Sequence, residues 1–204
     1  MKTFFYLTFF MILPLSVTTP GPWKLKKAKD TIEIYTRAYP DSPFKEFKAT
    51  SVLDTTFEEL LQELYDAPMY TPTCDFNISY RIASEKESSR FFYYKQEMPW
   101  PLKDRDVVTE LKLVEYTEDR IYLSIETVSD VLDIQDNCLR IEKLSGFWLL
   151  EKEEGGIRAT QQIHMDPGGR VPAIIVNPLV VKGPFKTFKE LHRKLDSHKE
   201  IAQN

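Results

Sequence analysis

The sequence predicts an α+β fold in which a curved antiparallel sheet grips one C-terminal helix. Most of the chain consists of short segments in which apolar and polar residues alternate, as they do in half-buried strands. The links between successive segments are short, and short links favour antiparallel pairing. One long apolar segment near the C-terminus then remains to cover a face of the sheet.

The strand predictions rest on this alternation. In residues 44–53, for example, Phe47, Ala49, Ser51 and Leu53 point to one side. The other segments predicted as strands are residues 31–37, 76–82, 90–98, 106–116, 120–128, 139–150 and 158–165. A short helix is expected to begin at Asp54 or Thr55, either of which can cap it, and to end before Pro68.

The C-terminal helix is expected to begin near Pro172. Residues 173–181 are apolar nearly all round, whereas residues 185–195 are apolar on one side only. A helix that is apolar all round needs cover on two sides, and a helix across the mouth of an apolar cavity meets this need. Proline is costly inside a helix, so a bend or break is predicted at Pro178 and again at Gly183-Pro184.

The N-terminus has the pattern of a secretory signal peptide, residues 1–18. Lys2 precedes a short apolar run, and small residues follow it. The run is shorter than the roughly 20 residues that span a bilayer. Export after cleavage is therefore expected, and an uncleaved anchor is the alternative. The folded domain is expected to span residues 21–198, with a C-terminal tail at 199–204.

Composition excludes several classes of protein. A net charge of −4 gives no sign of nucleic-acid binding. The chain lacks the His-Glu-x-x-His, Gly-x-Ser-x-Gly and phosphate-loop patterns, so no catalytic residue, metal or cofactor is predicted. Cys74 and Cys138 could pair or stay free, and Asn77 begins a glycosylation sequon only in a eukaryote.

Four segments together carry a family resemblance. They are residues 98–106 (MPWPLKDRD), 146–148 (GFW), 162–169 (QIHMDPGG) and 171–177 (VPAIIVN). In this order and spacing they resemble the START domain, the steroidogenic-acute-regulatory-related lipid-transfer family with a helix-grip fold. The chain departs from the family at Cys74-Asp75, where Trp-Asp is usual, and in its N-terminal helix, which is missing or reduced to residues 21–28. The link at residues 132–137 is also short and acidic.

The resemblance implies a tunnel that binds, and could transfer, one lipid or sterol-like molecule without catalysis. Each of the apolar candidates for its wall could instead pack against its neighbours in a filled core. The candidates are Phe92, Tyr94, Val107, Leu111, Leu123, Ile141, Trp148, Ile163, Ile174, Val181 and Phe185. Gln161 is expected to face inward with Ile163, and His164 to face solvent on the other side.

The Trp100 loop and the C-terminal helix are expected to gate this tunnel. Trp100 lies between two prolines and could touch a membrane surface or plug the loop. Arg105 and Asp106 could clamp a polar head group or tie the loop to the sheet. A monomer is expected. Two other hypotheses stay open: a helix-grip enzyme, such as a cyclase or hydrolase, and a structural or partner-binding module.

Overall fold

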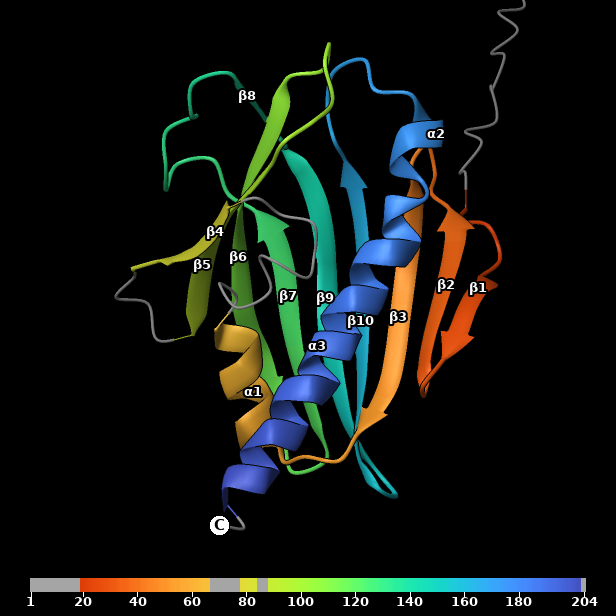
Figure 1. The fold of residues 1–204 in the computed structure, drawn as a ribbon, viewed down its shortest axis with the longest axis vertical. Coiled ribbons are helices and arrows are strands. Elements are labelled where there is room, and N and C mark those ends of the chain that lie inside the picture. Colours follow the sequence, from red (N-terminus) through yellow and green to blue (C-terminus); the bar gives the residue numbers. More distant parts are fainter. Residues whose placement is uncertain (1–18, 67–77, 84–87, 203–204) are drawn as a thin grey trace, which may run out of the picture.

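The computed structural model describes residues 19–66, 78–83 and 88–202. The predicted signal peptide, Cys74 and Asn77 lie outside these residues. The described part confirms the α+β prediction: a curved, mainly antiparallel sheet of ten strands holds the last helix, α3 (Leu179–Ala202), against its concave face (Figure 1).

The strand order in the sheet is β1-β2-β3-β10-β9-β7-β6-β5-β4, with β8 pairing beside β6. The bounds are β1 (Lys24–Lys29), β2 (Ile32–Ala38), β3 (Lys45–Leu53), β4 (Ile78–Ile82), β5 (Ser89–Gln96), β6 (Asp104–Tyr116), β7 (Arg120–Thr127), β8 (Cys138–Arg140), β9 (Lys143–Glu153) and β10 (Gly156–Asp166). The last strand therefore lies between β3 and β9, where Gln161 pairs with both Ala49 and Trp148.

One sequence-based expectation about the strands is wrong. Residues 139–150 do not form one strand, because the chain leaves the sheet at Ile141 and Glu142. β8 on one side of this break pairs parallel with β6, and β9 on the other side pairs with β7 and β10. Of the two alternatives for residues 21–28, the absence of a helix is the one that the structure shows, because most of these residues belong to edge strand β1.

Helix α1 (Phe57–Tyr65) begins one residue later than predicted, at the N-cap Thr56. The Thr56 hydroxyl accepts a hydrogen bond from the Glu59 amide at 3.2 Å, and the Glu59 carboxylate accepts one from the Thr56 amide at 3.0 Å. This reciprocal capping box satisfies two amides at the helix start, which neither Asp54 nor Thr55 does. The buried side chains Phe57, Leu60 and Leu64 then face the sheet and α3.

The apolar segment that follows β10 forms two helices, α2 (Ala173–Val176) and α3. The predicted break at Pro178 is confirmed, because no helix includes Asn177 or Pro178. A break at Gly183-Pro184 is not found, because α3 continues through Pro184. It also continues past the predicted domain end at residue 198.

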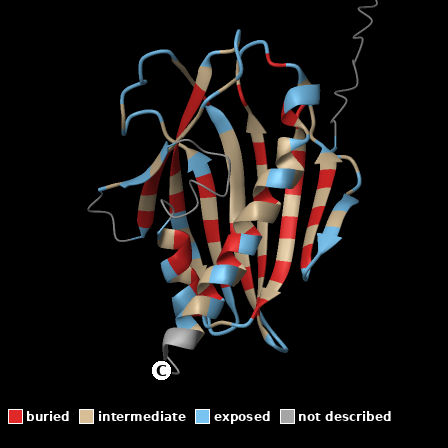
Figure 2. Ribbon diagram, viewed as in Figure 1, coloured by how far each residue is buried: buried red, intermediate tan, exposed pale blue. Residues whose placement is uncertain are grey.

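The core lies between the sheet and the C-terminal part of α3. Phe188, Leu191 and Leu195 of α3 pack with α1 and with fully buried strand residues such as Leu123 and Leu150. Figure 2 shows buried residues along the strands beneath this part of the helix. A second, small cluster joins Phe44, Val171 and Val176 at the α2 end.

Candidate functional site

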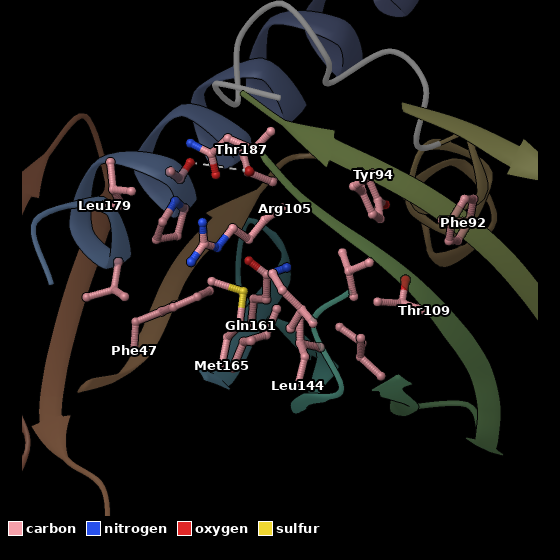
Figure 3. A pocket seen from close by; sticks show the side chains of 18 of the residues that line it. Phe47, Phe92, Tyr94, Arg105, Thr109, Leu144, Gln161, Met165, Leu179 and Thr187 are labelled. Atoms are coloured by element: carbon pink, nitrogen blue, oxygen red, sulfur yellow. Dashed lines mark hydrogen bonds between the residues drawn. The ribbon is translucent and has the colours of Figure 1, made fainter. Parts of the chain in front are cut away.

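A cavity of about 260 Å³ lies between the sheet and the N-terminal part of α3 (Figure 3). Its wall is contributed by β3, β5, β6, β7, β9, β10, α1, α2 and α3. The lining residues are Lys45, Phe47, Leu64, Phe92, Tyr94, Gln96, Arg105, Asp106, Val107, Thr109, Leu111, Ile125, Ile141, Leu144, Trp148, Gln161, Ile163, Met165, Val176, Leu179, Val180, Gly183, Pro184 and Thr187.

The cavity exists because the side chains of α3 that face it are small. Val180, Gly183 and Thr187 fall on one stripe at helical spacing, and all three line the cavity. A Cβ atom added at Gly183 would meet no other atom within 4 Å. The next large side chain on this side of α3 is Phe188, whose ring lies 5.4 Å from that of Trp148. These two rings divide the cavity from the filled core.

Most of the predicted wall residues do line the cavity. The nine that do are Phe92, Tyr94, Arg105, Val107, Leu111, Ile141, Trp148, Gln161 and Ile163. Alternation along β6 and β10 therefore identified the correct face of each strand.

Four of the predicted wall residues do not line the cavity: Leu123, Val181, Phe185 and Ile174. Leu123 points to the correct face of β7 but is fully buried in the core, and Ile125, two residues along, takes the cavity position. Val181 and Phe185 pack against the main core cluster. They follow the cavity residues Val180 and Pro184 by one position, which is a rotation of about 100° on a helix.

Ile174 is 82% exposed, and Trp100, also predicted at the site, is 93% exposed. In α2 the neighbours Ala173 and Val176 pack inward, so Ile174 faces outward. Trp100 stands on the β5–β6 connection, from which Leu102 packs against the small cluster of Phe44, Val171 and Val176. Figure 1 places this connection and α2 at the same end of the molecule. The loop and α2 are therefore joined by this small cluster.

Sequence reasoning missed several lining residues. Thr109 continues the alternation of Val107 and Leu111, and Met165 continues that of Gln161 and Ile163, so period-two spacing could have found both. The helix residues Leu179 and Val180 gave no such signal, because no polar face marks the orientation of that segment.

Arg105 brings a positive charge to the cavity wall. It is 5% exposed, and its guanidinium points into the centre of the pocket near Gln161 (Figure 3). It donates hydrogen bonds to the carbonyl oxygens of Lys103, Pro167 (3.5 Å) and Gly168 (3.3 Å). Burial lowers the pKa of this guanidinium from its usual value, although arginine stays protonated in proteins. Arg105 thus ties its own loop to the turn before α2 and also faces the cavity.

Asp106 has a different role from Arg105. Its two carboxylate oxygens each accept a hydrogen bond of 2.9 Å from the Arg140 guanidinium. The Asp106 hydrogen bonds are also the main cause that raises the pKa of Arg140. This buried, bidentate pair links β6 to β8 and leaves no net charge on the wall.

His164 is not solvated, contrary to expectation. It does lie on the opposite face from Ile163, but it is 7% exposed and stacks on Tyr39 with ring centroids 3.6 Å apart. Its Nε2 atom lies 3.1 Å from the Ser42 hydroxyl. Burial lowers its pKa. The polar pattern of β10 could not reveal that the β2–β3 connection covers this side chain.

Within residues 19–66, 78–83 and 88–202, no group of three His, Cys, Asp or Glu side chains could hold a metal ion. In that same part of the chain, no helix is long and apolar enough to cross a membrane.

Comparison with known proteins gives consistent results. A family model described as the START domain matches residues 17–201. An uncharacterized protein of Pseudomonas aeruginosa is 25% identical over 173 residues, which cover 83% of this chain and 84% of that one. The phosphatidylcholine transfer protein of Rattus norvegicus is 21% identical over 188 residues, covering 86% of this chain and 88% of that one.

Solved structures agree with the fold. A STAR-related lipid transfer protein from Xanthomonas axonopodis has a TM-score of 0.76 at 28% identity, covering 85% of this chain and 98% of that one. Human StAR-related lipid transfer protein 5 has a TM-score of 0.70 at 13% identity, covering 87% and 88%. The second likeness concerns the fold alone.

Proposed function

Because the chain belongs to the START domain family, we propose that it binds one lipid or other apolar molecule in the cavity beneath α3 and transfers it. The observation that carries this proposal is the cavity itself, a mainly apolar space with a few polar groups on its wall. Such a composition is typical of small-molecule sites. Each methylene group of a ligand buried there contributes on the order of 0.8 kcal/mol to binding.

The volume bears on the kind of ligand. About 260 Å³ lies just below the roughly 300–1,000 Å³ of ordinary ligand pockets. The cavity of this structure therefore suits a compact or single-chain molecule, and a larger lipid requires α2 and the N-terminal part of α3 to move outward.

The proposed gate consists of the Trp100 loop and α2. Their contact rests on the small cluster of Phe44, Val171 and Val176 with Leu102, which is separate from the main core. Opening this cluster disrupts few apolar contacts, so it costs less than opening the core. Leu102→Ala is expected to speed ligand release several-fold, measured by transfer of a fluorescent lipid between vesicles.

Contact with a membrane surface during exchange is part of this proposal. Trp100 and Ile174 are large, exposed apolar side chains at the end of the molecule that holds the gate. Tryptophan favours the interface between lipid and water. Export, suggested by residues 1–18, and a monomeric state complete the proposal.

A catalytic role has less support. Both oxygens of Asp106 are engaged by Arg140, and Arg105 stays protonated, so neither is suited to move a proton at neutral pH. The proposal is accordingly one of binding without reaction. An incubated ligand recovered in altered form would instead favour the enzyme alternative.

Native mass spectrometry of the protein after incubation with lipid vesicles tests the function. One apolar molecule per chain is expected. Val180→Phe, which fills the cavity, should abolish the complex, whereas Leu149→Phe on the outer face of β9 should not. A protein that carries no apolar molecule, or variants that behave alike, would overturn the proposal.

A further inference from the structure

The charged groups on the cavity wall do not cancel. Three charged side chains line the cavity: Lys45, Arg105 and Asp106. Asp106 is neutralised by its two hydrogen bonds to Arg140, which lies behind it. The remaining two charged residues of the lining are both cationic, and its other polar residues, Gln96, Thr109, Gln161 and Thr187, are uncharged.

Arg105 retains capacity to bind an anion. A guanidinium has five N–H groups, and three of them reach backbone carbonyl oxygens. One N–H on each terminal nitrogen has no acceptor among the described residues. Carbonyl oxygens carry no net charge, so they leave the charge of Arg105 uncompensated. Asp104, the neighbouring acid, is 3.3 Å from the Lys95 ammonium and accepts from the Met98 amide.

Lys45 lies at the same end of the cavity as Arg105. The Lys45 amide donates to the Asn177 side chain at 3.0 Å, at the junction of α2 and α3. Arg105 binds the carbonyl oxygens of Pro167 and Gly168, in the turn that leads into α2. Neither cationic side chain has a carboxylate within ion-pair distance among the described residues.

The opposite end of the cavity is apolar and the space between is narrow. Leu64, Leu111 and Trp148 line the far end. Along β6 the lining runs from Arg105 to Leu111, which is about 20 Å at the rise of a strand. Spread along that length, a volume of about 260 Å³ gives a narrow space that suits a single chain.

We infer that the preferred ligand is a single-chain amphiphile with an acidic head group, held by Arg105 and Lys45 at the α2 end, with its apolar chain directed toward Leu111. Carboxylates and phosphate monoesters share the pair of acceptor oxygens that a guanidinium binds with two hydrogen bonds. An alcohol or ester oxygen can accept a hydrogen bond from the guanidinium but leaves its charge unneutralised, so an acidic head group of the same length is bound more tightly. The inference rests on the proposed function and specifies its ligand class.

Titration calorimetry with four ligands of equal chain length tests the inference on the intact protein: dodecanoate, dodecyl phosphate, dodecanol and methyl dodecanoate. Both acids should bind at least tenfold more tightly than the alcohol and the ester. Binding of only one acid would identify the head group. If all four bind with equal affinity, the inference is wrong while the proposed function stands. If none binds, the proposed function fails as well.

Substitutions of the two cationic residues test whether they cause the preference for acidic ligands. Arg105→Gln should reduce the preference for the acids to less than threefold, and Lys45→Gln should reduce it in part. Lys48→Gln is the matched control, because Lys48 lies on the outer face of the same strand, near Trp23 and Tyr35. If Arg105→Gln does not fold, Lys45→Gln and the four-ligand comparison still decide. A full preference for acids in both cavity variants would contradict the assignment of these residues.

Discussion

The two halves of α3 lie against the same sheet and yet meet it in opposite ways. The C-terminal half presents Phe188, Leu191 and Leu195 to strand and α1 residues, and all three side chains are buried there. The N-terminal half presents Val180, Gly183 and Thr187, which line the cavity. The change occurs where the Phe188 ring meets Trp148.

The difference shows how one helix can both hold the domain together and cover a cavity. Large side chains that fill the core fix the C-terminal half. On the side that faces the cavity, short side chains leave the N-terminal half with fewer apolar contacts. Regions with few apolar contacts are the ones that open at low cost. Stability and function are thus assigned to successive turns of one element.

Truncation of Phe188 should give the largest effect on this comparison. Phe188→Ala removes a fully buried ring from the filled half and should lower the free energy of unfolding by about 3–5 kcal/mol. Val180→Ala, in the cavity half, should cost about 1 kcal/mol or less, because Val180 is only partly buried. Urea denaturation measures both. Equal losses would show that the halves do not differ in packing.

Replacing a small side chain by a large one should also affect the two regions differently: it should destabilise the filled core and be tolerated at the cavity. Ala159 is fully buried in the core, so Ala159→Phe should lower the free energy of unfolding by about 1–3 kcal/mol or more. Val180→Phe extends into existing space and should change it by less than about 1 kcal/mol while removing ligand binding. A strongly destabilised Val180→Phe would mean that the cavity is closed to an added side chain.

Replacement of Gly183 should have a smaller effect of opposite sign. Glycine inside a helix costs about 0.5–1 kcal/mol relative to alanine, and a Cβ at Gly183 meets nothing within 4 Å. Gly183→Ala should therefore raise the free energy of unfolding by that amount. Gly146→Ala is the contrasting control, because its Cβ would lie 2.2 Å from the Gln162 carbonyl oxygen. A destabilised Gly183→Ala would contradict the open space described here.

Lowering the pH should destabilise the protein only slightly, through a histidine on the half of α3 that packs in the filled core. The Nε2 atom of His192 lies 2.9 Å from the Ser51 hydroxyl, and burial lowers the His192 pKa below its usual 6.5. The folded chain then binds this proton less readily than the unfolded chain, so stability is lost as the pH falls below about 6.5. His192→Gln should lose less Tm than the wild type between pH 7.5 and 5.5. His164→Gln serves as a separate comparison, because burial lowers the pKa of His164 too.

Much of the fold follows from the sequence, because period-two alternation determines which face of a strand each side chain takes. Alternation does not tell how far along the face the cavity extends, and for this reason Leu123 was expected where Ile125 lies. On a helix that is apolar all round, no polar side marks the orientation, and the prediction for Val181 and Phe185 was wrong by one position.

The features that the sequence did not predict depend on contacts between residues far apart in the chain. The burial of His164 depends on Tyr39, which is 125 positions earlier in the sequence. The parallel pairing of β8 with β6 depends on a two-residue departure from the sheet that no local pattern marks. The charge on the wall at Arg105 was suggested by the family resemblance, and its backbone partners appear only in the folded chain.

The position of β10 governs the order in which the domain can assemble. The strand made last lies between β3 and β9, so the sheet consists of two unconnected parts until residue 166 has been synthesised. Until then both neighbours of β10 present open edges, and open edges attract foreign strands. Pairing between residues as distant as Ala49 and Gln161 is also slow, because a long loop must close first. The nascent chain therefore completes its fold only after nearly all of it has been made.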